Sequence, residues 1–230
     1  MRRDSIALTV TFALAPPARS QDAAAARAVA RVAADMERAV RRLRPERLVM
    51  ELPASPRGGT LDQAGLALWT ERLERLAGAA RDARPSTRIL LQTGVISPRD
   101  SALRAWASGT AGTLAGVVTP VGPDSRGAAG ILATLATLER WSETTSPARE
   151  QWIVVSGAPV LEGDDAQRRL VRHVLVWAAS RAFVRGIVLA DANDYDSMTG
   201  LRSAQGRLRA AVAEAAATVH VLSDSTPPSP

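Results

Sequence analysis

The sequence predicts an α/β protein built on a mostly parallel β-sheet. Short apolar runs of β type alternate with helical runs in about six βα units along the 230 residues, which is the pattern of strand–helix–strand units. Several of the short runs are apolar at nearly every position, as expected for parallel strands that are covered on both faces. No linker interrupts the pattern, so we expect one α/β domain over residues 1–222. The Pro/Ser-rich residues 223–230 predict a disordered tail.

Two arrangements of such units fit the pattern. One is an incomplete or degenerate (β/α)₈ barrel (TIM barrel), and the other is an open doubly wound sheet. A nucleotide-binding doubly wound sheet usually carries a glycine-rich turn after its first strand, whereas residues 15–20 read APPARS and contain no glycine. A dinucleotide site is therefore disfavoured. In either arrangement, functional side chains are expected at the carboxyl ends of the strands.

The first element allows two interpretations. Every second residue from Ile6 to Phe12 is apolar, which is the period of a strand over residues 6–14. Alternatively, residues 1–20 form a signal peptide, because two arginines precede an apolar segment that ends in a candidate cleavage site at residues 18–20. The compartment therefore stays open: the protein is secreted if this leader is present and cytoplasmic otherwise.

Five further strands and the helices between them follow from periodicity. The strands are expected over residues 47–52, 88–94, 114–120, 152–157 and 186–192. A short helix is expected over residues 101–108. Three longer helical runs carry apolar stripes at three- and four-residue spacing. These stripes are Val29, Val32, Met36, Val40 and Leu43; Leu66, Trp69, Leu73 and Leu76; and Leu170, His173, Val174 and Trp177. We therefore expect His173 to be buried. Residues 218–222 fit either a helix end or a short extra strand.

Composition excludes several classes of function. The formal net charge is +6, all 29 basic residues are arginine, and they are interleaved with acids rather than clustered, so we expect no nucleic-acid partner. No apolar stretch of about 20 residues is present, so no membrane span is expected. The absence of cysteine and lysine removes thiol and Schiff-base chemistry, and the two histidines cannot make a His-rich metal site. A Ser-His-Asp triad would have to use one of these two histidines. If the protein is an enzyme, carboxylates are the groups most available for catalysis, and we expect no cofactor.

The order of features resembles the retaining glycoside hydrolases built on (β/α)₈ barrels, from their third strand to their eighth. The sequence RLVMELPAS, at residues 47–55, is similar to the fourth strand of that family, which ends in the catalytic acid/base Glu. The sequences EQWIVVSGAPVLEGDDAQRRL and VRGIVLADANDYDSMTGL are similar to the seventh strand with its helix and to the eighth strand with its loop. The resemblance implies that Glu51 is the general acid.

The chain departs from that family in two ways. Strands similar to the family's first two are missing, so we expect either a fragment of a longer barrel or a remnant of about six units. Ser156 stands where the family has its nucleophilic carboxylate, and a serine cannot perform that step of a retaining mechanism. Met50 also replaces the asparagine that usually precedes the acid/base Glu.

Candidate site residues lie where the expected strands end. Glu51 is either a general acid or a strand-terminal carboxylate bonded to loop amides or an arginine. Gln92, Thr119 and Ser156 are candidates for the polar lining of a saccharide site. The acidic loop after the last strand supplies Asp191, Asn193, Asp194 and Tyr195, of which Tyr195 could stack on a sugar ring. This loop fails the EF-hand pattern, so capping is expected there rather than a metal site.

Two functions follow from these features. The first is a glycosidase, a hydrolase of glycosidic bonds, with Glu51 as its acid. The second is a non-catalytic pseudoenzyme or a ligand- or partner-binding domain of the same fold. An incomplete barrel also leaves unpaired strand edges, so we expect that the chain could form a homo-oligomer through its sheet edges.

Overall fold

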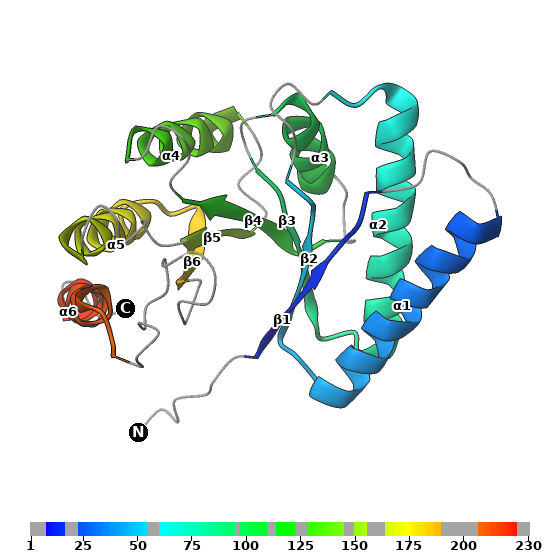
Figure 1. Ribbon diagram of the computed structural model, residues 1–230, viewed down its shortest axis with the longest axis horizontal. Helices are drawn as coiled ribbons and strands as arrows, with labels where there is room; N and C mark the ends of the chain where they lie inside the picture. The colour runs from blue at the N-terminus through cyan, green and yellow to red at the C-terminus, as the bar shows by residue number, and fades with distance from the viewer. Residues whose placement is uncertain are drawn as a thin grey trace, which may run out of the picture. The chain divides into compact units, whose positions relative to one another are not determined.

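The computed structural model describes most of the chain (Figure 1). The described residues are 8–16, 23–54, 60–94, 97–109, 114–122, 128–144, 150–155, 164–189 and 207–224.

The sheet contains six strands in the order of the sequence. The strands are β1 (Thr9–Ala13), β2 (Arg47–Glu51), β3 (Arg88–Gln92), β4 (Gly116–Val121), β5 (Glu150–Val155) and β6 (Val184–Leu189), and they are ordered β1-β2-β3-β4-β5-β6. The pairs β1–β2, β2–β3, β3–β4 and β5–β6 are parallel. Among the described strands this order never reverses, whereas a doubly wound sheet has a switch point. The prediction of an incomplete barrel is therefore confirmed.

The chain forms two compact units, Met1–Val118 and Thr119–Pro230, and the boundary lies inside β4. Each unit is described by itself. The single domain over residues 1–222 stays a prediction. Of the predicted disordered tail over residues 223–230, residues 223 and 224 end the last helix, and residues 225–230 lie outside the described residues.

Unit 1 consists of β1–β3, the start of β4, and the helices α1 (Ala23–Leu43), α2 (Gln63–Ala83) and α3 (Pro98–Gly109). Helices α1 and α2 lie side by side (Figure 1). Their apolar stripes form one core with alternate residues of the strands. This core includes Met36, Val40, Trp69, Leu73, Leu76, Leu48, Met50, Ile89, Leu91 and Val117. The predicted stripes of α1 and α2 are confirmed, except that Leu43 at the end of α1 is exposed.

Strand alternation gives the sheet of unit 1 two distinct faces. Leu48 and Met50 of β2 pack with the helices, so Val49 and Glu51 point to the opposite face. On β3, Ile89 and Leu91 likewise meet the helices, and Gln92 lies on the other face. In a (β/α)₈ barrel the face opposite the helices is the inner face of the barrel. Glu51 and Gln92 therefore share the face that lines the interior in this class of fold.

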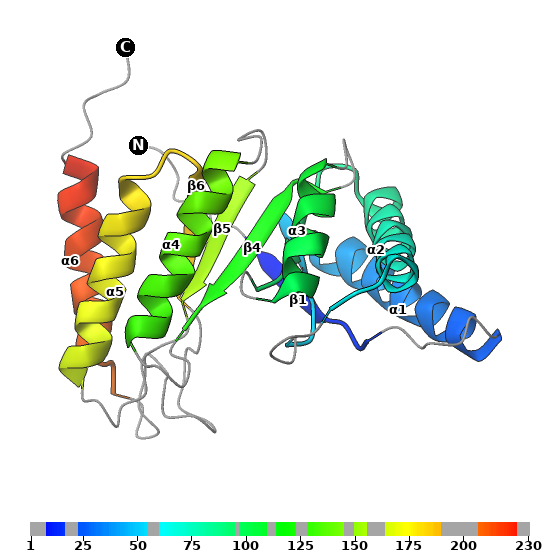
Figure 2. The same cartoon turned by 90° about the horizontal axis from the view of Figure 1, so that it is seen from above.

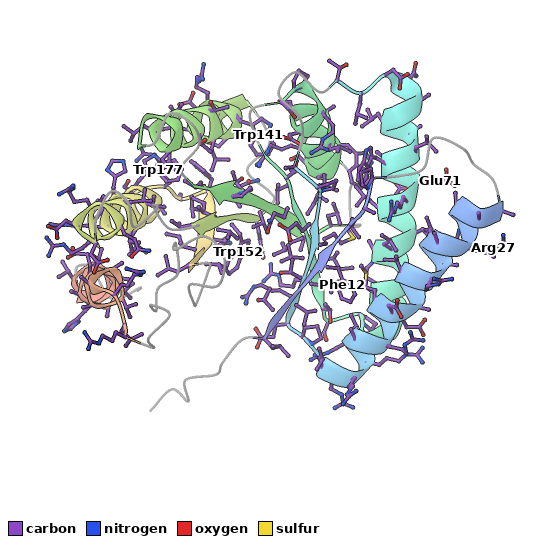
Figure 3. The ribbon with its side chains drawn as sticks, viewed as in Figure 1. Phe12, Arg27, Glu71, Trp141, Trp152 and Trp177 are labelled. Atoms are coloured by element: carbon purple, nitrogen blue, oxygen red, sulfur yellow. The ribbon has the colours of Figure 1, made fainter. Side chains whose placement is uncertain are left out.

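Strand β1 confirms the strand interpretation for Thr9–Ala13. Val10 and Phe12 are half-buried and pack against the core, with Phe12 labelled in Figure 3, whereas Thr9, Thr11 and Ala13 are exposed. Residues 1–7 lie outside the described part of the chain. β1 and β6 are the outer strands of the sheet, and self-association through them stays a prediction.

Unit 2 contains β5, β6, the rest of β4, and the helices α4 (Ala128–Thr144), α5 (Asp164–Ala179) and α6 (Ala210–Asp224). Helices α5 and α6 pack side by side (Figure 2), with Val171 and Leu175 against Ala211 and Ala215. Residues 218–222 are therefore the end of a helix rather than a strand. No helix in the described part of the chain is both long and apolar enough to cross a membrane.

The predicted stripe of α5 is confirmed in part, because Val174 is buried and Leu170 and Trp177 are half-buried. The buried residues are Gln167, Val171, Val174, Leu175 and Ala178. His173 is exposed, which corrects the expectation that it is buried. The helix carries two overlapping apolar stripes, and packing against α6 selects the one that contains Val171 and Leu175.

Trp152 shows how β5 and β6 fit together in unit 2 (Figure 3). A Cβ atom at its register partner Gly186 would lie 2.2 Å from the Trp152 ring, so only glycine leaves room for the indole. The indole Nε1 donates to Glu150 Oε2 at 2.9 Å. This arrangement agrees with a packing role for Trp152.

Candidate functional site

The carboxyl ends of β2 and β3 bring two of the predicted site residues together. Glu51 ends β2 and Gln92 ends β3, and the parallel register pairs these two positions directly. Gln92 Nε2 donates a hydrogen bond to Glu51 Oε1 at 2.7 Å. Both side chains are half-buried. The two strand ends therefore present a carboxylate and an amide as one hydrogen-bonded pair.

The strand neighbours of this pair are a small exposed residue on β1 and a buried residue on β4. In the register of β1, the position opposite Glu51 is Ala13, which is exposed and small. On the other side, Gln92 pairs with the buried Val118. Among the described residues, Gln92 is the hydrogen-bond partner of the Glu51 carboxylate, and this bond uses one oxygen. The second oxygen, Oε2, can accept from or donate to a ligand.

A buried charged cluster lies directly after β3. Asp100 Oδ1 accepts hydrogen bonds from Thr93 Oγ1 at 3.2 Å and from Arg99 Nη2 at 2.8 Å. Arg104 Nη2 donates to the carbonyl of Thr93 at 3.2 Å. Asp100 and Arg104 are buried, and the Arg99 side chain is 11% exposed. We call Thr93, Arg99, Asp100 and Arg104 the Asp100 cluster.

The Asp100 cluster connects the segments that follow both strands of the pair. Arg99 Nη2, which binds Asp100, also donates to the carbonyl of Pro53 at 2.7 Å. Pro53 lies two residues after Glu51, and Thr93 is the residue after Gln92. The cluster therefore joins the chain beyond β2 to the chain beyond β3.

Burial changes the acid–base properties of Arg104. Desolvation lowers the pKa of its guanidinium to about 9, while the charge of Asp100 acts in the opposite direction. This pKa is still above 7, so Arg104 remains charged at neutral pH. Two guanidinium groups and one carboxylate are thus held together with little access to water.

Local sequence explains why the cluster forms. Pro98 begins α3, and Ser97 Oγ accepts the backbone N–H of Asp100 at 3.0 Å, which is the first half of a capping box. Arg104 lies one helical turn after Asp100. A Cβ atom at Gly94 would lie 2.6 Å from Asp100 Oδ2, so the glycine lets the chain after β3 pass against this carboxylate.

Sequence reasoning did not identify the Asp100 cluster. The signal was present as Ser97-Pro98-Arg99-Asp100, a capping pattern at the start of the short third helix. Capping alone would have explained Asp100 as an exposed helix-terminal acid, and only the tertiary structure places it in the interior.

The other predicted site residues are distributed differently. Thr119 was expected as polar lining at the end of the fourth strand, but it lies within β4 and is fully buried. Five predicted residues lie outside the described part of the chain: Ser156, Asp191, Asn193, Asp194 and Tyr195. In the described segments, no group of three or more His, Asp or Glu side chains could hold a metal ion.

Comparison with solved structures identifies a similar fold. The intracellular xylanase TsXylA from Thermoanaerobacterium saccharolyticum JW/SL-YS485, solved in complex with xylotriose, matches with a TM-score of 0.56 and 12% sequence identity. The match covers 83% of this chain and 64% of the xylanase chain, so this chain spans just under two thirds of the length of that protein. No protein-family model matches the sequence, and no curated protein matches it. The likeness shows the fold alone, which is that of an incomplete (β/α)₈ barrel.

Proposed function

We propose that this protein binds a saccharide at the carboxyl ends of β2 and β3, and that Glu51 acts there as a general acid on the glycosidic bond. The observation that carries the proposal is the position of Glu51. It ends a parallel strand on the face opposite the helices, and its carboxylate is oriented by Gln92 through one oxygen. In barrel enzymes the carboxyl ends of the strands hold the catalytic residues.

The chemistry requires an oriented proton donor. Protonated Glu51 would transfer its proton to the glycosidic oxygen while the bond from that oxygen to the anomeric carbon breaks. The hydrogen bond from Gln92 to Oε1 leaves Oε2 for this transfer. A second carboxylate must assist, about 5–5.5 Å away for retention of configuration or about 6.5–9.5 Å away for inversion.

A second candidate function is saccharide binding without turnover. Ser156 follows β5 at the position where the resemblance expects the nucleophilic carboxylate. Without that carboxylate, a retaining mechanism has no covalent intermediate. In this alternative, Glu51 and Gln92 would bind sugar hydroxyl groups rather than the scissile oxygen.

The xylanase complex with xylotriose suggests the first ligands to test, which are xylo-oligosaccharides and aryl glycosides of different leaving-group acidity. If Glu51 is the acid, Glu51→Gln lowers turnover by about 10²- to 10⁴-fold on poor leaving groups and less on acidic ones, because acidic leaving groups need less protonation. The matched control is Glu71→Gln on the exposed surface of α2 (Figure 3), which leaves turnover unchanged.

Each result distinguishes the candidates. Binding of xylo-oligosaccharides without turnover by the unaltered protein supports the second function and rejects the first. Turnover that is insensitive to Glu51→Gln excludes Glu51 as the acid. Absence of both binding and turnover across the panel rejects saccharide recognition.

A further inference from the structure

We infer that Arg99 and Asp100 are positioning residues that hold the ends of β2 and β3 together and thereby set the geometry of the Glu51–Gln92 pair. The functional meaning of this inference rests on the proposed function, whereas its structural content can be tested without any saccharide.

Asp100 and Arg99 connect the segments that follow β2 and β3. Asp100 Oδ1 accepts a hydrogen bond from Thr93 Oγ1 at 3.2 Å, and Thr93 directly follows Gln92. The same oxygen accepts a hydrogen bond from Arg99 Nη2 at 2.8 Å, and that nitrogen also donates to the carbonyl of Pro53 at 2.7 Å. A single carboxylate oxygen and a single guanidinium nitrogen thus join both strand extensions.

These contacts lie within two residues of the Glu51–Gln92 pair along the chain. The backbone ladder continues past the strands, because Leu52 N–H donates to the carbonyl of Gln92 at 3.0 Å. Leu52 links Glu51 to Pro53, so a shift of Pro53 relative to Thr93 acts within one or two residues on both side chains of the pair. The 2.7 Å bond between Gln92 and Glu51 is sensitive to such a shift, because hydrogen bonds weaken steeply with poor geometry.

Arg99 and Asp100 place two charged groups where they have little access to water. A buried ion pair is weak evidence for stability, since apolar residues of similar volume are often as stable or more stable. The planar guanidinium group holds its N–H donors in a rigid fork. It therefore fixes both the direction and the length of its hydrogen bonds, which an apolar contact does not. The cluster combines this fork with the close approach of Gly94, where a Cβ atom would lie 2.6 Å from Asp100 Oδ2. These features favour a role in geometry.

The test follows the side-chain amide of Gln92 by nuclear magnetic resonance in the full chain without ligand. Gln92→Met identifies the resonance by deleting it, and Glu51→Gln defines its shift when the carboxylate is replaced. Arg99→Met removes the contacts to Pro53 and Asp100 but leaves Asp100 beside Arg104. We expect Arg99→Met and Asp100→Asn to move the Gln92 amide resonance toward its position in Glu51→Gln, and Arg99→Lys to restore it only in part because an ammonium lacks the fork.

The matched control is Thr87→Val, which removes a buried hydrogen bond to the carbonyl of Pro45 at the opposite edge of the same two strands. A role in general stability would predict equal responses from Thr87→Val and Arg99→Met. If the Gln92 resonance in Arg99→Met stays as close to the unaltered protein as it does in Thr87→Val, the inference is overturned. If Asp100→Asn does not fold, Arg99→Met alone decides.

Saccharide assays separate this inference from the proposed function. If the unaltered protein turns over glycosides, Arg99→Met lowers kcat by up to about 100-fold with a smaller change in KM, because a misplaced acid still allows substrate binding. A moved Gln92 resonance in a protein that binds no saccharide supports the positioning role and rejects the proposed function. If the protein binds a saccharide but the Gln92 resonance does not move in Arg99→Met, the proposed function is supported and the positioning role is rejected.

Discussion

The amino ends and the carboxyl ends of strands β2 and β3 are joined by different kinds of contact; we call these ends the amino edge and the carboxyl edge. At the amino edge, Thr87 Oγ1 donates to the carbonyl of Pro45 at 2.9 Å, and Arg84 Nη1 donates to the carbonyl of Arg44. At the carboxyl edge, the Asp100 cluster buries a carboxylate between arginines. Arginine side chains donate to backbone carbonyls at both ends, but at the carboxyl end the contacts also include the buried carboxylate of Asp100. Among the described contacts, the added buried carboxylate distinguishes the carboxyl end, which agrees with a demand for defined geometry at the end that carries Glu51.

This difference agrees with the different roles of the two strand ends in barrel folds. The amino ends of the strands serve stability, and the carboxyl ends carry the chemistry. Charged groups in a protein interior are expensive unless they are paired and hydrogen-bonded. Unit 1 buries such a carboxylate beside Glu51, whereas at the other end of the same strands the hydrogen bonds come from Thr87 and the half-buried Arg84.

The strongest test of the comparison is Asp100→Ala. Removing this carboxylate leaves Arg99 and Arg104 without their shared counter-charge, and we expect the free energy of unfolding of unit 1 to fall by about 3–5 kcal/mol. Native-state hydrogen exchange at the amides of β2 and β3 measures this loss. Asp35→Ala is the control, because its ion pair with Arg38 on α1 is exposed. A loss at Asp100 as small as that at Asp35 would show that the cluster is not energetically coupled.

An intermediate effect is expected from Gly94→Ala. The new methyl group would lie 2.6 Å from Asp100 Oδ2, so the chain after β3 or the carboxylate must move, at a cost of about 1–3 kcal/mol. Gly78→Ala is the matched control, because it lies inside α2 with no atom within 4 Å of the added methyl group. There the change should stabilise the protein by up to about 1 kcal/mol. Thermal denaturation of both variants measures whether each substitution lowers or raises the midpoint temperature. A change in the same direction for both variants would contradict the close approach at Gly94.

The smallest effect is expected at the amino edge. Thr87→Val removes one buried hydrogen bond and preserves the shape of the side chain, so the free energy of unfolding should fall by about 1 kcal/mol. Saccharide binding should remain unchanged, as measured by isothermal titration calorimetry. Loss of binding in this variant would mean that both edges control the site, and the contrast between them would fail.

Much of the fold was accessible from the sequence because burial on both faces leaves a strong pattern. The strands beginning at Arg47 and Arg88 start where they were predicted, since apolar runs of this kind are typical of parallel strands. β4, β5 and β6 begin at Gly116, Glu150 and Val184, displaced from the expected Leu114, Trp152 and Gly186. The backbone hydrogen bonds between neighbouring strands determine where each strand begins, and the hydrophobic pattern of the sequence carries no information about these bonds.

The sequence by itself determined that helices alternate with parallel strands and that Glu51 terminates one of them. It could not determine the face on which Glu51 lies, because Leu48, Val49 and Met50 are all apolar and show no alternation. It could not determine the partner of Glu51 either, because Gln92 is adjacent only through the register of two strands distant in the chain. The burial of Asp100 between arginines likewise arises when α3 packs against the strand ends, since local patterns record spacing along the chain and not proximity in space.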